Sequence, residues 1–249
     1  MDVFLLGTGT AIPIEGHSPS GLVVKASGRN LLFDIGPGTL GRLRFAGIDC
    51  SQIDDLLLTH LHPDHTLDLA TLLLVFNYAP NAQRTAPFSI TGCRGLRDFL
   101  KRMVDLYPEV APVSFELQLR EVRSDEFSVG QLNVRTAPTG HTPESVAYRL
   151  DDGSRSLVYS GDAAAQGELV RLAEGADLLI SECSFPSGWE TEDHLNADAL
   201  GRIAQRAGVR SVVVVHTYPP ALEVDLVGQI RQHYHGDVQV GVDGLHISV

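Results

Sequence analysis

The stretch LLLTHLHPDH, residues 56–65, places three histidines and an aspartate directly after an apolar run. The run at residues 56–59 predicts the end of a buried strand. His60 and His62 follow it two positions apart, so extended backbone would point both side chains in the same direction. Only ten of the 249 residues are histidine. Three of them within six positions therefore indicate a site and not a chance polar loop.

A tight turn after this strand would bring two more polar side chains to the same place. Pro63 suits the first turn of a helix, which would carry Asp64 and His65 round toward the two preceding histidines. Imidazole nitrogens and carboxylate oxygens are ligands for zinc, manganese or iron, and a catalytic site leaves one position open for water. Four such groups could serve two neighbouring ions.

The composition of the whole chain limits the classes of partner. The formal charge is -12 with only two lysines, which argues against a sequence-independent grip on a long phosphate backbone. Cys50, Cys93 and Cys183 form no C-x-x-C pair, so neither a disulfide framework nor a thiolate zinc site is expected. The N-terminus MDVFLLGTGTAIP lacks a basic start, and no apolar run reaches the roughly 18 residues of a membrane span. We therefore expect a cytoplasmic protein without a membrane segment.

Apolar runs alternate with helical patterns along the chain, without an internal repeat or a linker. We expect a single domain over residues 1–249, of the α/β class, with two β-sheets sandwiched between helical layers. The expected strands cover residues 3–6, 21–24, 31–34, 56–59, 88–91, 115–122, 132–137, 146–150, 157–160, 178–181, 212–215, 238–240 and 245–248. The expected helices cover residues 37–46, 67–78, 94–106, 166–174, 197–207 and 223–234.

Three more candidate ligands follow expected strands elsewhere in the chain. His141 lies in PTGHT, Asp162 in LVYSGD and His216 in VVVVHTYPP. Strand ends at one edge of a sheet converge in space, so these side chains could meet the cluster at residues 60–65. The glycines of GTGTA lack the third glycine of a dinucleotide motif, and Pro13 follows them, so they predict a tight turn near the same edge.

The order of THLHPDH, His141, Asp162 and His216 resembles that of the metallo-β-lactamase-fold hydrolases, and within them the ribonuclease Z-like phosphodiesterases. The resemblance covers essentially the whole chain, beginning with FLLGTGTAIP and LLFDIGPGTLGRL. It implies an αββα sandwich in which two mixed β-sheets are flanked by helices. It also implies two divalent metal ions, zinc in the first place, with manganese or iron as alternatives.

The same resemblance divides the ligands between the two ions. One ion would be held by His60, His62 and His141 and the other by Asp64, His65 and His216, with Asp162 bridging them. Ions about 3.5 to 4 Å apart can lower the pKa of a shared water, which would then attack as hydroxide. Asp64 could in addition orient or deprotonate that water.

Three further residues are expected to support this chemistry. Asp34 ends an apolar strand, and the resemblance implies that it braces the histidine loop by hydrogen bonds; a simple turn aspartate is the alternative. Glu182 ends another strand in SECSF, and His194 precedes a helix in DHLNADAL that Asn196 could cap. Taken alone, His194 would be a surface histidine. The resemblance implies that it donates to the scissile phosphate or leaving oxygen while Glu182 orients it, a task that suits a cationic imidazole.

Two features depart from the tRNA-processing members of this group. Those commonly carry a long arm between the histidine of PTGHT and the bridging aspartate, but only twenty residues, 142–161, intervene here. The early loop IEGHSPS also lacks their Arg-Asn pair. These departures argue against tRNA 3′ processing and leave the metal chemistry untouched.

The leading hypothesis is a dinuclear metal-dependent phosphodiesterase that acts on small or cyclic phosphodiesters or on short nucleic-acid ends. An ester, lactone or thioester hydrolase would use the same site, and a metal-bearing regulatory or binding subunit is the non-enzymatic alternative. Because relatives commonly dimerise, a homodimer is a further expectation. The apolar helix at residues 67–78 could serve either the core or its interface.

Overall fold

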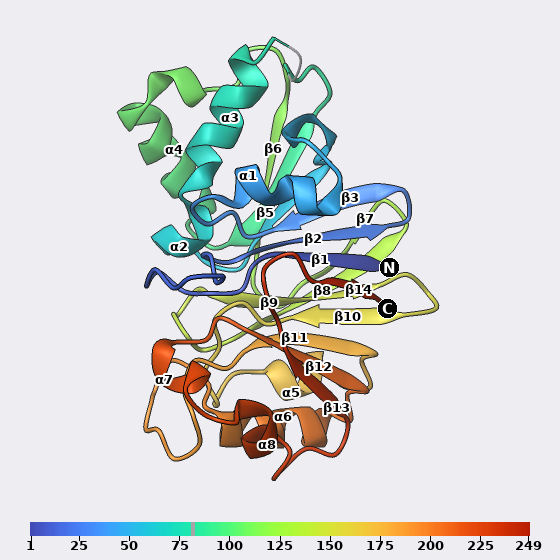
Figure 1. Cartoon of the computed structure of the whole chain (residues 1–249). Helices are drawn as coiled ribbons and strands as arrows, with labels where there is room; N and C mark the ends of the chain where they lie inside the picture. Colours follow the sequence, from blue (N-terminus) through green and yellow to red (C-terminus); the bar gives the residue numbers. More distant parts are fainter. Residues whose placement is uncertain (81–82) are drawn as a thin grey trace.

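The computed structural model describes residues 1–80 and 83–249 and contains two mixed β-sheets packed face to face. Each sheet has seven strands, and helices cover the two outer faces (Figure 1). The predicted α/β class, with two mixed sheets flanked by helices, is confirmed. Among the described residues, no helix is long and apolar enough to cross a bilayer. The single-domain organisation and the cytoplasmic location stay predictions.

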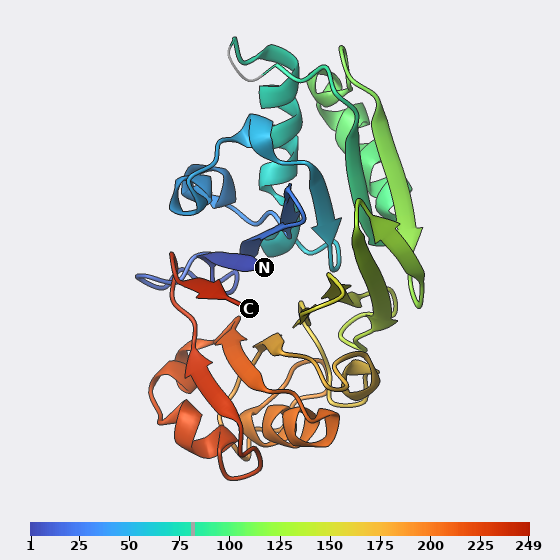
Figure 2. The ribbon, with the colours of Figure 1, turned by 90° about the vertical axis from the view of Figure 1, so that its right-hand side faces the viewer.

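The first sheet contains the N-terminal strands and the C-terminal one. From edge to edge it consists of β14 (His246–Ser248), β1 (Asp2–Gly7), β2 (Gly21–Ala26), β3 (Arg29–Phe33), β4 (Asp55–Leu58), β5 (Phe88–Cys93) and β6 (Leu117–Val122). The pairs from β3 to β6 are parallel, and the others are antiparallel. Because β14 pairs with β1, the two chain ends lie side by side (Figure 2).

The second sheet contains the remaining strands. From edge to edge it consists of β13 (Asp237–Val240), β12 (Ser211–Val215), β11 (Leu178–Glu182), β10 (Ser156–Tyr159), β9 (Val146–Asp151), β8 (Leu132–Pro138) and β7 (Glu126–Val129). The pairs from β10 to β13 are parallel, and those from β7 to β10 are antiparallel. In both sheets the parallel strands direct their carboxyl ends toward one edge of the sandwich.

The helices bury an apolar face against each sheet. The first sheet is accompanied by α1 (Thr39–Arg42), α2 (Pro63–Thr66), α3 (Asp68–Tyr78) and α4 (Leu96–Leu106), and the second by α5 (Leu169–Leu172), α6 (Ala197–Ala207), α7 (Pro219–Leu222) and α8 (Leu226–Ile230). Buried apolar side chains form three layers, one between the sheets and one under each set of helices. Full burial of a single leucine or phenylalanine stabilises the fold by about 1.5–3 kcal/mol.

Predicted and observed helices differ most in the second half of the chain. The helix 197–207 has the predicted bounds, because Asn196 caps it at Ala199 N and Gly208 ends it in the left-handed conformation. The predicted helix 166–174 is reduced to α5, since the backbone of Ala164 and Gly167 lies against Thr139 instead. The predicted helix 223–234 is reduced to α8, which begins only after Asp225 caps it. The short elements β7 and α7 were not predicted.

The helix α3 serves both the core and an open surface. Its inner side chains, including Leu69, Leu73 and Phe76, are fully buried. Its outer side, together with α2 and α4, lines an apolar groove of about 800 Å³ in which Leu67 and Leu74 are exposed. The sequence left core and interface open as alternatives; the described helix buries one side in the core and leaves the other side exposed. A homodimer through this groove stays a prediction.

Candidate active site

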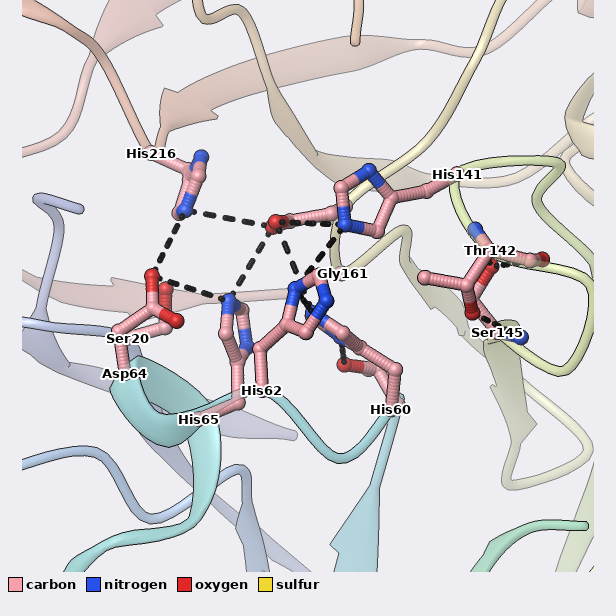
Figure 3. A network of polar contacts seen from close by, with 12 residues as sticks. Ser20, His60, His62, Asp64, His65, His141, Thr142, Ser145, Gly161 and His216 are labelled. Carbon is pink, nitrogen blue, oxygen red and sulfur yellow. Dashed lines mark hydrogen bonds and ion pairs between the residues drawn. The ribbon is translucent and has the colours of Figure 1, made fainter. Parts of the chain in front are cut away.

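Each candidate side chain except His194, which lies in the loop between β11 and α6, is at or just past the carboxyl end of a strand. The strands and the residues that end or follow them are β3 with Asp34, β4 with residues 60–65, β8 with His141, β10 with Asp162, β11 with Glu182 and β12 with His216. Because the two sheets pack face to face, these ends meet. The imidazoles and carboxylates of both sheets point toward one another at this edge (Figure 3).

Four ligand atoms form a first group. His60 Nε2 lies 3.0 Å from His62 Nδ1, which lies 3.2 Å from His141 Nε2. Asp162 Oδ2 lies 3.7 Å from His60 Nε2 and 3.5 Å from His141 Nε2. Donor atoms placed tetrahedrally around zinc, at about 2.0–2.1 Å from it, are roughly 3.3 Å apart. The first group therefore has the spacing of a tetrahedral ligand set.

Four more atoms form a second group on the other side of the same aspartate. His65 Nε2 lies 3.2 Å from Asp162 Oδ1 and 3.8 Å from Asp64 Oδ2. His216 Nε2 lies 3.4 Å from Asp162 Oδ1 and 3.5 Å from Asp64 Oδ2. Each carboxylate oxygen of Asp162 thus faces a different group, an arrangement that suits a bridging ligand.

Three atoms of the second group lack hydrogen-bond partners, and a bound cation would supply the missing interaction. His65 Nε2, His216 Nε2 and Asp162 Oδ1 are buried and have no hydrogen-bond partner among the residues that the structure describes. A buried polar atom without a partner is costly, by about 1–3 kcal/mol. A divalent ion at the point that they face would satisfy all three, and their chemistry suits zinc, manganese or iron.

The charges around the two groups favour a bound cation. Burial, together with the nearby charge of His65, holds the pKa of His60 well below its ordinary value, so this ligand is neutral. Burial opposes ionisation of Asp162, yet His216 and His65 outweigh it and keep the pKa of Asp162 well below its usual range. Burial likewise opposes protonation of His65, but the charges of Asp162 and Asp34 raise its pKa well above the ordinary value. A buried negative charge of this kind needs a proton or a metal ion beside it.

Asp34 connects one histidine of each group. It is fully buried, and its Oδ2 accepts hydrogen bonds from His65 Nδ1 at 2.8 Å and from the Tyr159 hydroxyl at 2.9 Å. Thr59 donates to Asp34 through its backbone N at 2.8 Å and through its hydroxyl at 2.9 Å. Since that hydroxyl donates to Asp34, it accepts from His60 Nδ1, 3.0 Å away. Both imidazoles are thereby fixed with Nε2 directed at the ligand groups.

Glu182 holds a second pair of histidines in the same way. It is fully buried, with Oε1 3.0 Å from His194 Nδ1, and its Oε2 accepts from the Ser184 hydroxyl at 2.6 Å. Ser184 Oγ in turn lies 3.4 Å from His216 Nδ1. The backbone N of Ala163 also donates to Glu182, at 2.5 Å.

His194 stands next to both ligand groups with one nitrogen already engaged. Its ring centroid lies 4.7 Å from that of His141 and 5.6 Å from that of His216. Burial opposes its protonation, but the hydrogen bond to Glu182 and the charge of that carboxylate raise the pKa of His194 to about 9. The imidazole is thus held as a cation at neutral pH.

The backbone is strained at two of these positions. Asp34 and His216 have φ values of 52° and 51°, in the left-handed region that residues other than glycine rarely adopt. Such strain costs about 1–3 kcal/mol per residue and concentrates at functional sites. His216 N donates to Thr8 O at 2.6 Å, in the turn formed by GTGTA, which helps to hold it there. Glycine is required at position 36, where a Cβ would lie 2.0 Å from Asp64 O.

Four contributing residues were missed in the sequence. Thr59 and Ser184 carry hydroxyls inside motifs that had already been singled out, and this position was the available signal. The backbone O of Asp193, next to His194, accepts from His141 Nδ1 at 2.8 Å. Tyr159 lies in an apolar strand, and its sequence context gives no sign that its hydroxyl reaches Asp34.

Comparison with known proteins finds relatives in both sequence and structure. The sequence model of the metallo-beta-lactamase superfamily matches residues 13–201. A ribonuclease Z of Mycolicibacterium gilvum is 27% identical over 281 aligned positions, covering 99% of this chain and 95% of that protein. The crystal structure of the metallo-beta-lactamase fold protein YhfI from Bacillus subtilis has a TM-score of 0.85 at 24% identity, covering 99% of this chain and 98% of that one. Human tRNase Z, short form, has a TM-score of 0.80 at 25% identity, covering 100% and 99%.

Proposed function

The chain belongs to the metallo-beta-lactamase superfamily, and from this premise we propose that it is a metal-dependent phosphodiesterase. Its substrates would be small or cyclic phosphodiesters or short nucleic-acid ends. The observation that carries the proposal is His194, a histidine that Glu182 holds at 3.0 Å beside two groups of ligand atoms. A protonated imidazole in this position suits an anionic ester that must lose an alkoxide.

We propose that seven side chains hold two divalent ions, with zinc as the first candidate. The first ion would be held by His60, His62 and His141, the second by Asp64, His65 and His216, and both by Asp162. When bound, the ions would lower the pKa of water and offset the negative charge of the phosphate. The relatives named ribonuclease Z and tRNase Z support a phosphoester as the bond that is cleaved.

His194 and Asp64 would move protons. Glu182 accepts from His194 Nδ1, which leaves the Nε2 proton of the imidazolium to be donated to the leaving oxygen. Asp64 is more exposed than Asp162, with 12% of its side chain accessible, and would accept a proton from the attacking water. Asp34 would take no part in proton transfer, since its oxygens are occupied by Thr59, His65 and Tyr159.

The surroundings of the site favour a small substrate over a long polyanion. The twenty residues from 142 to 161, between His141 and Asp162, form β9 and β10. This segment therefore has no room for an RNA-binding arm. One cation of the helix α4 and one just before it are matched by neighbouring carboxylates. Lys101 lies 2.6 Å from Asp105, and Arg94 lies 3.8 Å from Glu144.

Hydrolysis of a dinucleotide by protein loaded with zinc or manganese tests the proposal, because its alkoxide leaving group needs a proton whereas the p-nitrophenolate of bis(p-nitrophenyl) phosphate does not. His194→Ala should lower kcat by about 10²–10⁴, the usual contribution of a general acid, while the metal content stays at the wild-type value. His233→Ala is the matched control, because His233 pairs with Asp198 outside the site. Unchanged kcat in His194→Ala would contradict the assigned role.

A further inference from the structure

A second hollow adjoins the candidate site on the side of His194. Its volume is about 910 Å³, and it lies along the loop between β11 and α6. The side chains that line it include Phe185, Trp189, Glu190, Glu192, Asp193 and His194. Since His194 would give its proton to the leaving oxygen, a leaving group that departs past His194 enters this hollow.

One wall of the hollow is a fixed aromatic stack. Trp189 lies parallel to Phe185, with centroids 5.0 Å apart and planes 4° apart, and Phe185 lies parallel to Tyr218 at 5.2 Å. Tyr218 in turn meets His194 edge-on at 5.8 Å. Trp189 is nevertheless 44% exposed, and its backbone O accepts from Asn196 Nδ2 at 2.8 Å. A large aromatic face is thus held rigidly and left open to a ligand.

The rim of the hollow carries three carboxylates, of which Asp193 lies near the imidazoles of His194 and His141. Glu190, Glu192 and Asp193 are exposed, and none of them forms an ion pair with any residue in the described part of the chain. The one basic side chain among the lining residues is His194, which Glu182 already pairs. The hollow therefore repels an additional phosphate and attracts a cation.

An exposed indole face beside unpaired carboxylates binds an alkylammonium group through cation–π attraction and charge. We propose that this hollow receives a cationic leaving group, so that the substrate is a small phosphodiester of an amino alcohol. The identity of the reaction rests on the proposed phosphodiesterase function, whereas the cation site rests on the hollow itself. Water would attack phosphorus and pass a proton to Asp64. The bond from phosphorus to the amino-alcohol oxygen would break, and that oxygen would take a proton from His194, giving a phosphomonoester and an amino alcohol.

Binding can be measured without turnover because Trp189 is the single tryptophan of the chain. Titration of the metal-loaded protein with choline at constant ionic strength should change its fluorescence saturably. Ethanolamine separates a quaternary from a primary ammonium, and 3,3-dimethylbutanol is the uncharged isostere of choline. The isostere should bind at least tenfold more weakly. Isothermal titration calorimetry on the same samples gives the affinity if fluorescence does not respond.

Charge-neutral variants locate the site. Glu190→Gln/Glu192→Gln should weaken choline binding by about fivefold or more. Glu116→Gln/Glu126→Gln, just before β6 and at the start of β7, does not touch the lining of the hollow and should leave choline binding unchanged. Absence of saturable binding by either method, equal affinity for 3,3-dimethylbutanol, or an unchanged Kd in the first double variant would overturn the proposal. The same three results would leave the phosphodiesterase proposal standing.

Turnover provides the second readout. The kcat/KM for methyl choline phosphate should exceed that for methyl 3,3-dimethylbutyl phosphate by about tenfold or more, and Glu190→Gln/Glu192→Gln should abolish the preference. Equal kcat/KM for the two diesters would contradict selection of a cationic leaving group. If choline bound but no phosphodiester were hydrolysed, the proposed function would be contradicted while the cation site would be supported.

Discussion

Asp34 in the first sheet and Glu182 in the second are two fully buried carboxylates with the same arrangement of partners. Each lies at the carboxyl end of a parallel strand, and each binds the Nδ1 of one histidine directly. Each also accepts from a hydroxyl, Thr59 in one case and Ser184 in the other, and that hydroxyl contacts a second imidazole. A buried carboxylate and a hydroxyl thus orient two histidines on each side of the site.

The histidines oriented by Asp34 and those oriented by Glu182 differ in their position relative to the groups of ligand atoms. On the Asp34 side, His65 and His60 both direct Nε2 into the groups of ligand atoms. On the Glu182 side, His216 does the same, but His194 stands beside the groups and its pKa is raised to about 9. His194 also lies within 4.8 Å of ligand atoms of Asp162 and His216, so its role as a proton donor rests on its pairing with Glu182 and not on isolation from the ligand groups.

The largest expected effect is the loss of a ligand on the Asp34 side. His65→Ala removes one donor from the second group, so bound metal should fall from two ions per chain to at most one. Phosphodiester hydrolysis should fall by at least about 10³-fold, which is the upper cost of removing one donor that stabilises a developing oxyanion. Metal analysis of the dialysed protein, together with kcat, checks both numbers. If the variant retained two ions, His65 would not be a metal ligand, and the proposed difference between the histidines of Asp34 and His194 would be contradicted.

Loss of the orienting carboxylate itself should be milder. Asp34→Asn keeps the shape of the side chain and removes its charge, so metal affinity should fall by about 10–100-fold, as is usual when a ligand loses its hydrogen-bond partner. Competition with a chelator measures this affinity directly. Glu182→Gln is the matched comparison and should change metal affinity less, because Glu182 reaches only one ligand, His216, and does so through Ser184. Equal losses in both variants would contradict the asymmetry.

The effect of Glu182 should instead be visible in the pH dependence of hydrolysis. The folded pKa of His194 is raised, so its proton is present at low pH and is lost as the pH rises through that value. Activity should therefore decline on the alkaline side, at or somewhat below pH 9 because bound cations oppose the imidazolium charge. In Glu182→Gln this decline should move to lower pH by about 1 to 2 units. A pH profile of kcat that is identical in the two proteins would show that His194 does not supply the proton.

Removal of the tyrosine behind Asp34 should have the smallest effect. Tyr159→Phe deletes one donor to Asp34 and leaves the other three in place, so metal affinity should fall by about two- to tenfold. The same chelator competition measures it, and thermal unfolding of the metal-free protein separates this change from a loss of stability. A fall as large as that of Asp34→Asn would mean that Tyr159, and not the carboxylate charge, sets the orientation of His65.

The sequence reveals the contiguous part of this site more readily than the dispersed part. The candidate ligands at residues 60–65 can be recognised in the sequence because one strand end and one turn bring them together, whatever the rest of the chain does. The positions of His141, Asp162 and His216 after expected strands made them candidates to join this cluster, but only the family pattern divided them between two ions. Their convergence depends on how β8, β10 and β12 align in the second sheet, and a single sequence does not specify strand order or register.

Other features escape prediction because they arise only from tertiary contact. The positive φ of Asp34 and His216 has no signature in residue type, since glycine is absent from both positions. The hydroxyl of Tyr159 is directed at Asp34 by the packing of the two sheets. The edge strand β7 alternates in burial but has only four residues, and the helix predicted for residues 166–174 gives way to backbone contacts with Thr139. In each case a neighbour distant in sequence outweighs the local preference.

Anomalous scattering at the zinc edge, from crystals of protein loaded with zinc, tests the central claim most directly. Two peaks are expected, one within about 2.0–2.2 Å of His60 Nε2, His62 Nδ1 and His141 Nε2, and one at the same distance from Asp64, His65 and His216, with an oxygen of Asp162 on each. His194 should remain on Glu182 and contact neither ion. A single peak, or a peak bound to His194 Nε2, would contradict the division between histidines that hold metal and the one that holds a proton.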